Sequence, residues 1–411
     1  MNISILIKTI LCILAISSIS SMTLQAQNCT ETEDLLLDQG TLSDHKKSPL
    51  QGFISDFTPA EKTVALKTLN ALESHCIKDF AIQGGDAQAW FSFNEAYYFD
   101  IWLHKSYEYK IGFYQFVCVN GKRVHSSEFI SDFEITANPS IPCFFNIPSE
   151  FESSNSFFDA DLTKNSGPRI AVFRYLVFTN SDFADVINNG NGYYEDDKGD
   201  EFNNRRDIYR IWYITHPGKK MFTEVSRKEY LNSLLEYYDR EKFLLTKRND
   251  TKIAEAKKYM AEYEKSGNKA MYQSNFEDLQ AAQNERTELT NRYTTKKDNI
   301  INLLNSKPGD WLQQTARIDP KMRDNGYCSS SNDYSQSGYF TFGGFCETSN
   351  AAIVYKWNPE CFNIQVQSPA EPLFFKVAFR YKANTPFTLN IKDNFVEKFD
   401  LEGIKKLVIL N

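Results

Sequence analysis

The sequence predicts an α+β protein with an aromatic-rich, mainly antiparallel sheet body in two parts and a long antiparallel, coiled-coil-like helical hairpin between them. Short segments of alternating apolar and polar residues indicate strands before and after the hairpin. Capping signals and helical periodicity dominate residues 226–305, with one interruption near the middle. The hairpin returns the chain to its starting point, so the two β-rich parts can join into one sheet system.

The first 26 residues have the three-part layout of a secretory signal peptide. Lys8 precedes an apolar run at 10–19, and Ala26 ends the segment. We expect cleavage after Ala26 and a secreted or periplasmic protein. The apolar run is too short for a transmembrane helix, which needs about 20 residues, and no later stretch approaches that length. We therefore expect no transmembrane anchor.

Charge and length bound the partners and the domain organisation. The formal net charge is −7, and Lys8 is the only charged residue among 1–26, so the processed chain is also acidic. An acidic chain is a poor partner for nucleic acid. The patterned segments predict five units. They are the signal peptide 1–26, an N-terminal α+β domain 27–225, the helical hairpin 226–305, a linker 306–337 and a C-terminal β-rich domain 338–411.

Eight cysteines are present, of which Cys12 lies in the predicted signal peptide. Disulfides are expected in an exported protein, but the seven remaining cysteines cannot all pair within one chain. Cys76 and Cys118 could meet, and two separate buried thiols are the alternative. Because no pair has C-x-x-C spacing and the histidines are well separated, we expect no metal site and no cofactor.

The N-terminal part contains a clear helix and a clear strand. The stretch TPAE at 58–61 is a capping box, and an apolar stripe predicts a helix from there to about Cys76. Residues 107–119 alternate like a strand and end at an Asn-Gly pair, which predicts a two-residue turn. This turn places Phe116 opposite His125.

Further strands are predicted on both sides of the hairpin. Residues 170–178 and 208–214 are apolar on both faces, as central strands of a covered sheet are. Between them, residues 188–207 are charged and rich in turn formers, which predicts a long exposed loop. The elements expected after the linker are strands at 338–342, 352–357 and 374–381 and a short helix that starts from Asp400.

Residues 226–305 predict two helices of nearly equal length. The capping box SRKE at 226–229 starts the first, and the second runs over 269–305. The tripeptide SGN at 266–268 separates them. Because each helix would be about 55 Å long at 1.5 Å per residue, reversal at this break brings their outer ends together.

The side-chain pattern supports this pairing. Folding about a centre near residue 266 or 267 places the polar run 246–251 opposite 281–288 and brings Arg248 near Glu285. The hairpin is thus expected to be apolar at both ends and polar in the middle. The predicted seam of the second helix is Tyr272, Phe276, Leu279, Gln283, Arg286, Thr290, Tyr293, Lys297, Ile300 and Leu304.

The tip of the hairpin has two interpretations. The hairpin can pack only on itself and on the body, with its charges forming an ordinary solvated face. Alternatively, the tip offers apolar surface to another protein or to a second copy of the chain. The partner-binding candidates are Tyr259, Met260, Tyr263, Met271 and Tyr272.

No local signature of a common hydrolase, metalloprotease or nucleotide enzyme is present, so we predict no catalytic residues. A guanidinium in an apolar strand needs an anionic or carbonyl partner, and flat aromatic rings can stack on sugars. The ligand-binding candidates on these grounds are Arg174, Arg210, Trp90, Trp102 and His125.

These observations favour an exported, non-catalytic binding or assembly protein of the bacterial envelope, with the hairpin as its interaction arm. Its partner would be an envelope or extracellular protein, or a second copy. The alternative is a secreted hydrolase or glycan-binding protein, with its site in the aromatic block 90–125 or at Arg174 and Arg210.

Overall fold

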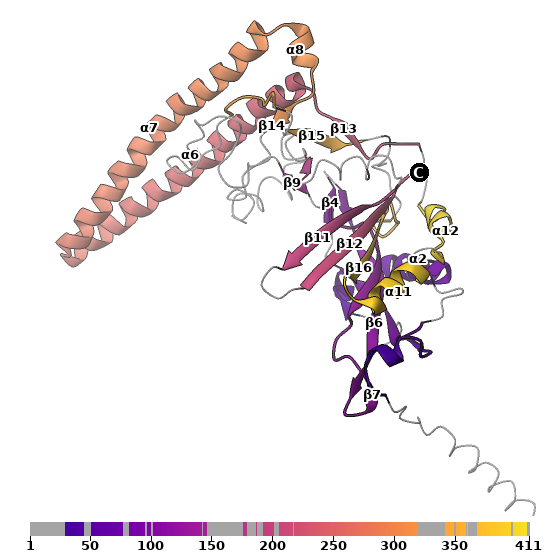
Figure 1. Ribbon diagram of the computed structural model, residues 1–411. Coiled ribbons are helices and arrows are strands. Elements are labelled where there is room, and N and C mark those ends of the chain that lie inside the picture. The colour runs from indigo at the N-terminus through magenta and orange to yellow at the C-terminus, as the bar shows by residue number, and fades with distance from the viewer. Residues whose placement is uncertain are drawn as a thin grey trace, which may run out of the picture.

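The computed structural model describes residues 29–44, 51–76, 82–94, 97–99, 102–141, 143–145, 176–178, 186, 192–200, 205–216, 218–318, 342–348, 351–358, 360, 368–395 and 398–408. They form a mixed α and β body with a projecting pair of long helices (Figure 1). The predicted signal peptide, Arg174 and the predicted linker beyond Ile318 lie outside the described residues. So do residues 338–341 of the strand predicted at 338–342.

The predicted N-terminal helix is confirmed as α2 (Pro59–Cys76). The backbone N–H of Thr58 donates to the Glu61 carboxylate at 2.8 Å, and the backbone N–H of Glu61 donates to the Thr58 hydroxyl at 3.3 Å. This capping box satisfies two N–H groups that the helix itself leaves unpaired. The buried residues of α2 are Ala65, Leu69, Leu72 and Cys76.

The larger sheet joins strands from both sides of the hairpin. Among the described residues it has nine strands in the main order β1-β3-β6-β8-β16-β12-β11, with β2 beside β3 and β7 beside β6. The two pairings of β1 and β2 with β3 are parallel, and the rest are antiparallel. The bounds are β1 (Leu42–Asp44), β2 (Gln51–Gly52), β3 (Gly85–Phe93), β6 (Tyr107–Val119), β7 (Lys122–His125), β8 (Ser131–Ala137), β11 (Tyr194–Asp200), β12 (Arg205–Ile214) and β16 (Phe375–Lys382).

Two details of this sheet test the sequence predictions. Asn120 and Gly121 have φ of 52° and 73°, as a type I′ turn requires, and Phe116 pairs with His125 as expected. The long exposed loop predicted at 188–207 is wrong, because its residues 194–200 form β11. This strand lies at the edge of the sheet, where charged side chains remain in water and only one neighbour must be paired.

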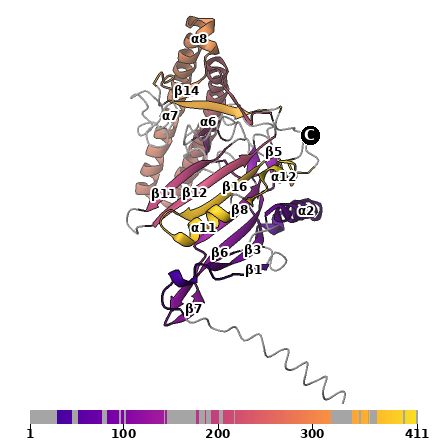
Figure 2. The same ribbon diagram turned by 45° about the vertical axis from the view of Figure 1, so that its right-hand side comes forward.

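One face of the larger sheet forms the main core. It is covered by α2, α11 (Pro386–Phe395) and α12 (Leu401–Lys405), which lie along the same side of the strands (Figures 1 and 2). Phe133 makes an edge contact with Phe395 at 4.5 Å between ring centroids. Asp400 caps α12 through the backbone N–H of Gly403, as its sequence position predicts.

A smaller sheet lies at the base of the hairpin. Its order is β13-β15-β10-β9, with β14 beside β15. β15 coincides with the strand predicted at 352–357. The bounds are β9 (Cys143–Phe145), β10 (Leu176–Phe178), β13 (Phe222–Glu224), β14 (Arg317–Ile318) and β15 (Ala352–Trp357). The remaining short elements are η1 (Glu33–Leu35), η2 (Ile54–Asp56), the paired strands β4 (Tyr97–Phe99) and β5 (Trp102–His104), and α8 (Gly309–Gln313).

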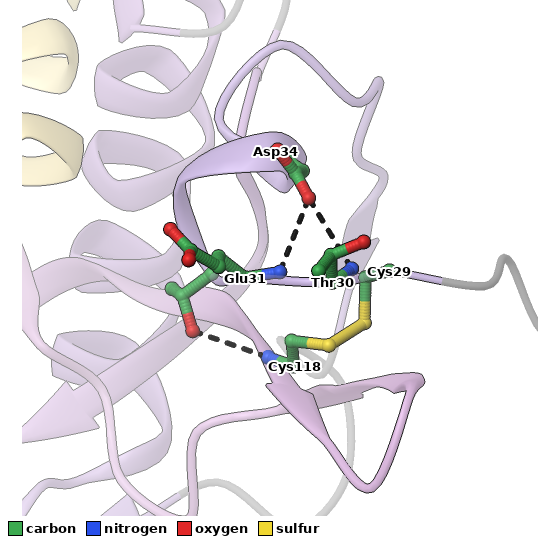
Figure 3. Close-up of a disulfide and its surroundings, with 6 residues drawn as sticks. Cys29, Thr30, Glu31, Asp34 and Cys118 are labelled. Carbon is green, nitrogen blue, oxygen red and sulfur yellow. Dashed lines mark hydrogen bonds between the residues drawn. A yellow bond between two sulfur atoms is a disulfide. The ribbon is translucent and has the colours of Figure 1, made fainter.

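A disulfide ties the N-terminal segment to the larger sheet. Cys29 bonds to Cys118, and the backbone N–H of Cys118 donates to the Thr32 hydroxyl at 3.2 Å (Figure 3). The suggested meeting of Cys76 and Cys118 is therefore wrong. Cys76 is a free, buried thiol because α2 turns it into the core, whereas Cys118 lies at the outer end of β6. Cys346 is also disulfide-bonded.

Candidate functional site

The two long helices pack closely as an antiparallel pair, which we call the arm. α6 (Arg227–Ser266) ends at Gly267 with φ 70°, and Asn268 caps α7 (Lys269–Ser306). A left-handed residue reverses a helical chain at little steric penalty when it is glycine. The far end of the arm projects away from both sheets (Figure 1).

Three ion pairs between the helices fix the register of the arm. Lys297 Nζ lies 2.7 Å from Asp239, Arg286 Nε lies 2.7 Å from Asp250, and Lys252 Nζ lies 3.9 Å from Glu285. To within one residue, the partners are equally far in sequence from Asn268, so the predicted centre near 266 or 267 is slightly early. The two predicted polar middles do lie opposite each other.

The seam predicted for α7 is partly wrong. Gln283 and Thr290 are exposed and Lys297 is only half-buried, whereas the preceding residue in each case is buried. The predicted and the observed seams both contain Tyr293 and Ile300. They differ at the remaining positions, where α6 packs against Ala282 and Leu289 rather than against the polar Gln283 and Thr290. The buried residues of α7 are Ala282, Leu289, Tyr293, Lys296 and Ile300.

The tip of the arm carries apolar side chains at the surface. Tyr259 is 43% exposed and Met271 is 42% exposed. The rings of Tyr259 and Tyr263 are stacked with centroids 6.5 Å apart. Met260, Tyr263 and Tyr272 are half-buried, so the five predicted partner-binding residues differ in how much surface they offer.

The base of the arm belongs to the body. Tyr230, Leu231 and Leu234 of α6 share a buried cluster with Ile318 and Val354 of the smaller sheet. Lys356 Nζ also lies 2.7 Å from Glu229. The arm is thus anchored at one end and free of the sheets at the other.

A second candidate region is the opposite face of the larger sheet, where charged residues replace the apolar core. Lys376 Nζ lies 3.1 Å from Glu134, and Lys110 Nζ lies between Glu134 and Asp132 at 3.6 and 3.8 Å. Arg380 Nε donates to Asp132 at 2.6 Å. We call these five residues, on β6, β8 and β16, the charged face.

Burial and neighbouring charges separate the carboxyl pKa values there. Burial raises the pKa of Asp132 against the opposing effect of Lys110 and Arg380. Burial also favours a higher pKa for Glu134, but nearby Lys376 and Lys110 outweigh it and lower the pKa. Such separation can serve acid–base chemistry, and it also arises in purely structural ion networks.

Trp90 lies beside the charged face. It pairs directly with Lys110 across the β3–β6 ladder, and its ring lies 6.1 Å from that of Phe129. Lys110 and Arg380 both lie over the Phe129 ring, at 5.6 and 5.3 Å from its centroid. Gly112 makes room for this stack, because a Cβ there would meet Phe129 and Trp90 at 3.2 Å.

The structure does not bring the predicted ligand-binding residues into one site. Arg210 on β12 donates to Glu195 at 2.9 and 2.7 Å and stacks on Tyr193, so its charge is already balanced. It lies four strands from Trp90, or about 19 Å. His125 is on β7, 3.4 Å from Asp86. Trp102 is on β5, and its side chain lies outside the described part.

Sequence reasoning missed the charged face, although its members were visible. The strand sequences at 131–137 and 375–382 alternate charged or polar with apolar residues, which signals one polar face. What the sequence does not contain is the register that aligns Lys376 with Glu134 across 242 residues.

Searches of the described residues add two findings. None of their helices is both long and apolar enough to cross a membrane. They also contain no group of three or more His, Cys, Asp or Glu that could hold a metal ion. Comparison with family models, curated proteins and solved structures finds no match.

Proposed function

We propose that the protein is a non-catalytic binding or assembly protein that uses the arm to contact an envelope or extracellular protein, or a second copy of the chain. The supporting observation is the contrast between the two ends of the arm. The base is buried in the body, while the tip projects with Tyr259 and Met271 exposed.

Export and function in the bacterial envelope are part of this proposal. The disulfide between Cys29 and Cys118 fits an oxidising compartment. Among the described rings of the aromatic block, Phe91, Phe93 and Tyr109 are buried and so are not available to a sugar. This favours the arm over these rings as the binding surface.

The experiment compares two double variants, each of which replaces two exposed apolar residues by serine. Tyr259→Ser with Met271→Ser removes the exposed tip, and Phe243→Ser with Ile301→Ser removes exposed apolar residues nearer the base. Light scattering measures self-association, and quantitative affinity capture from envelope fractions, with mass spectrometry, identifies any partner. We expect the tip variant alone to lose at least tenfold in association. Equal association in both variants and the unaltered protein would contradict the proposal.

A second candidate is a secreted hydrolase or glycan-binding protein, favoured by the half-exposed Trp90 beside paired cations and carboxylates. Rings of this kind stack on sugars while charged groups bind hydroxyls. Tryptophan fluorescence titrated with soluble oligosaccharides tests it, with Trp90→Phe as the control. A saturable change that the control lacks would support glycan binding, and its absence would remove this candidate at Trp90.

A further inference from the structure

Residues 342–348 form an irregular segment across the base of the arm, which we call the strap. The backbone N–H of Phe342 donates to the Tyr238 hydroxyl at 3.0 Å, and the Phe342 and Phe345 rings flank Tyr230 at 5.8 and 5.6 Å. Phe345 also contacts Trp311 of α8 at 5.7 Å. The strap thus contacts the start of α6 and the segment that follows α7.

The strap closes over Arg227, the first residue of α6. The guanidinium lies 4.5 Å from the Trp311 ring and 5.3 Å from the Phe345 ring, with its side chain 3% exposed. Its Nη2 donates to Glu347 at 2.9 Å, while Nε and Nη1 are buried and have no hydrogen-bond partner among the described residues. Glu347, by contrast, is 67% exposed.

Because Arg227 is buried and Glu347 is exposed, loss of either partner has a different energetic consequence. A buried guanidinium that loses its carboxylate is left as an unpaired charge, whereas an exposed carboxylate that loses its guanidinium is solvated by water. Docking of the strap is therefore held by the ring contacts and by the ion pair with Glu347, and loss of Glu347 costs more than loss of Arg227.

The backbone of the strap is also tied to the body. The N–H of Cys346 donates to the carbonyl oxygen of Arg317 on β14 at 2.9 Å, and Cys346 is disulfide-bonded. A tethered segment rebinds as an intramolecular event at high effective concentration. Lifting of the Phe345 and Glu347 side chains is then a local, reversible step.

We propose that the strap is a latch that sets the direction of the arm, with Glu347 as the ionic contact that holds it over Arg227. When the latch is closed, the arm base is clamped between α8 and the smaller sheet. When it opens, Arg227 becomes hydrated and α6 keeps its packing on the smaller sheet without the clamp of the strap, so the direction of the arm varies more. The inference rests on the proposed function for its biological meaning, but the latch itself can be tested without any partner.

Hydrogen exchange of the Phe342 amide, which donates to Tyr238, measures opening of the latch, and the Cys346 amide, which stays bonded to Arg317, is the internal reference. Glu347→Ala should raise the exchange of the Phe342 amide by about 100-fold, because it leaves the buried guanidinium unpaired. Arg227→Met keeps an apolar chain between the rings, so exchange should stay within about threefold of the unaltered protein, and the double variant should behave like Arg227→Met. The latch is refuted if Glu347→Ala exchanges as slowly as the unaltered protein or if Arg227→Met does not rescue it.

Arm direction is measured by electron-spin distance distributions between labels at Lys67 on α2 and Lys265 near the tip, attached through unnatural amino acids so that the native cysteines stay intact. We expect a wider distribution in Glu347→Ala and a narrow one in the double variant. Asp239→Ala is the control, because it removes an ion pair within the arm that does not involve the strap. Equal widths in all four proteins would show that the strap does not direct the arm.

Discussion

The arm and the larger sheet are stabilised in opposite ways. The arm is built from two continuous helices that pair along a narrow seam, with ion pairs at its middle. The sheet depends on contacts between distant segments, such as β16 with β8, and on a core of interlocked aromatic rings. Local capping and periodicity specify the first, whereas non-local register specifies the second. The two regions should therefore respond differently to the same kind of perturbation.

Removal of the Cys29–Cys118 disulfide should give the largest difference. Its partners are 89 residues apart, so Cys29→Ser with Cys118→Ser should destabilise the sheet by about 4–5 kcal/mol through the entropy of the unfolded chain. Hydrogen exchange under non-reducing conditions should show faster opening of β3 and β6 and unchanged protection of the arm middle. An equal loss in both regions would mean that they unfold as one unit.

Truncation of a buried side chain in the arm seam should destabilise the arm and leave the sheet unchanged. Leu289 is fully buried, so Leu289→Ala should reduce the stability of the arm by about 3 kcal/mol. Thr290→Ala, at the position that the sequence pattern placed in the seam, should change it by less than about 0.5 kcal/mol. Helix unfolding followed by circular dichroism distinguishes them. A larger effect at Thr290 would restore the seam predicted from sequence.

The charged face should make the stability of the larger sheet depend on pH. Glu134→Gln should destabilise the sheet by about 2 kcal/mol at pH 7, because Lys110 and Lys376 lose a partly buried partner. Burial and the charge of Glu134 raise the pKa of Glu108. The folded state therefore holds the Glu108 proton more tightly, and its contribution to stability is lost as pH rises through the raised pKa.

In Glu108→Gln, the free energy of unfolding should therefore fall less steeply as pH rises above the ordinary glutamate pKa. In Glu134→Gln, it should fall less steeply as pH drops below that value. Urea denaturation between about pH 3 and pH 8 measures both slopes, because the Glu134 contribution is lost below the ordinary glutamate pKa of about 4.3. If both variants changed the pH dependence of the free energy of unfolding in the same direction, the opposite pKa shifts of Glu108 and Glu134 would be contradicted.

The smallest expected effect is at the hinge of the arm. Gly267 has a left-handed φ of 70° and open space around it, so Gly267→Ala meets only backbone strain. We expect a loss of about 1 kcal/mol in arm stability and none in the sheet. Thermal melts of this variant beside Ser266→Ala, which keeps the glycine, would detect it. An unchanged melting temperature would show that the chain can reverse at residue 267 without a glycine.

The sequence was sufficient for the bounds of the two arm helices because the signals at their ends are local. Ser226 caps α6, Gly267 reverses the chain and Asn268 caps α7, each within a few residues of the helix that it bounds. The choice between Leu289 and Thr290 for the seam was not local. It depends on which side of α7 faces α6, which periodicity alone leaves open.

The sheet and its charged face could be predicted only in fragments. The capped helix α2, the Asn-Gly turn and the strand at 352–357 follow from short-range patterns. β11 was missed because its charged residues do not alternate with apolar ones. It is a strand because its backbone pairs with β12. Lys110, Glu134 and Lys376 meet only after β16 inserts between β8 and β12, which no local pattern encodes.

In the proposed function, the arm folds along its own seam and its tip, rather than the body, binds the partner. The most direct test replaces residues 253–284 by Ser-Gly-Asn, so that Lys252 and Glu285, already paired across the helices, flank a short turn. Binding to the captured partner or to a second copy is then measured together with sheet stability. We predict lost binding with an unchanged sheet, and retained binding would contradict the account.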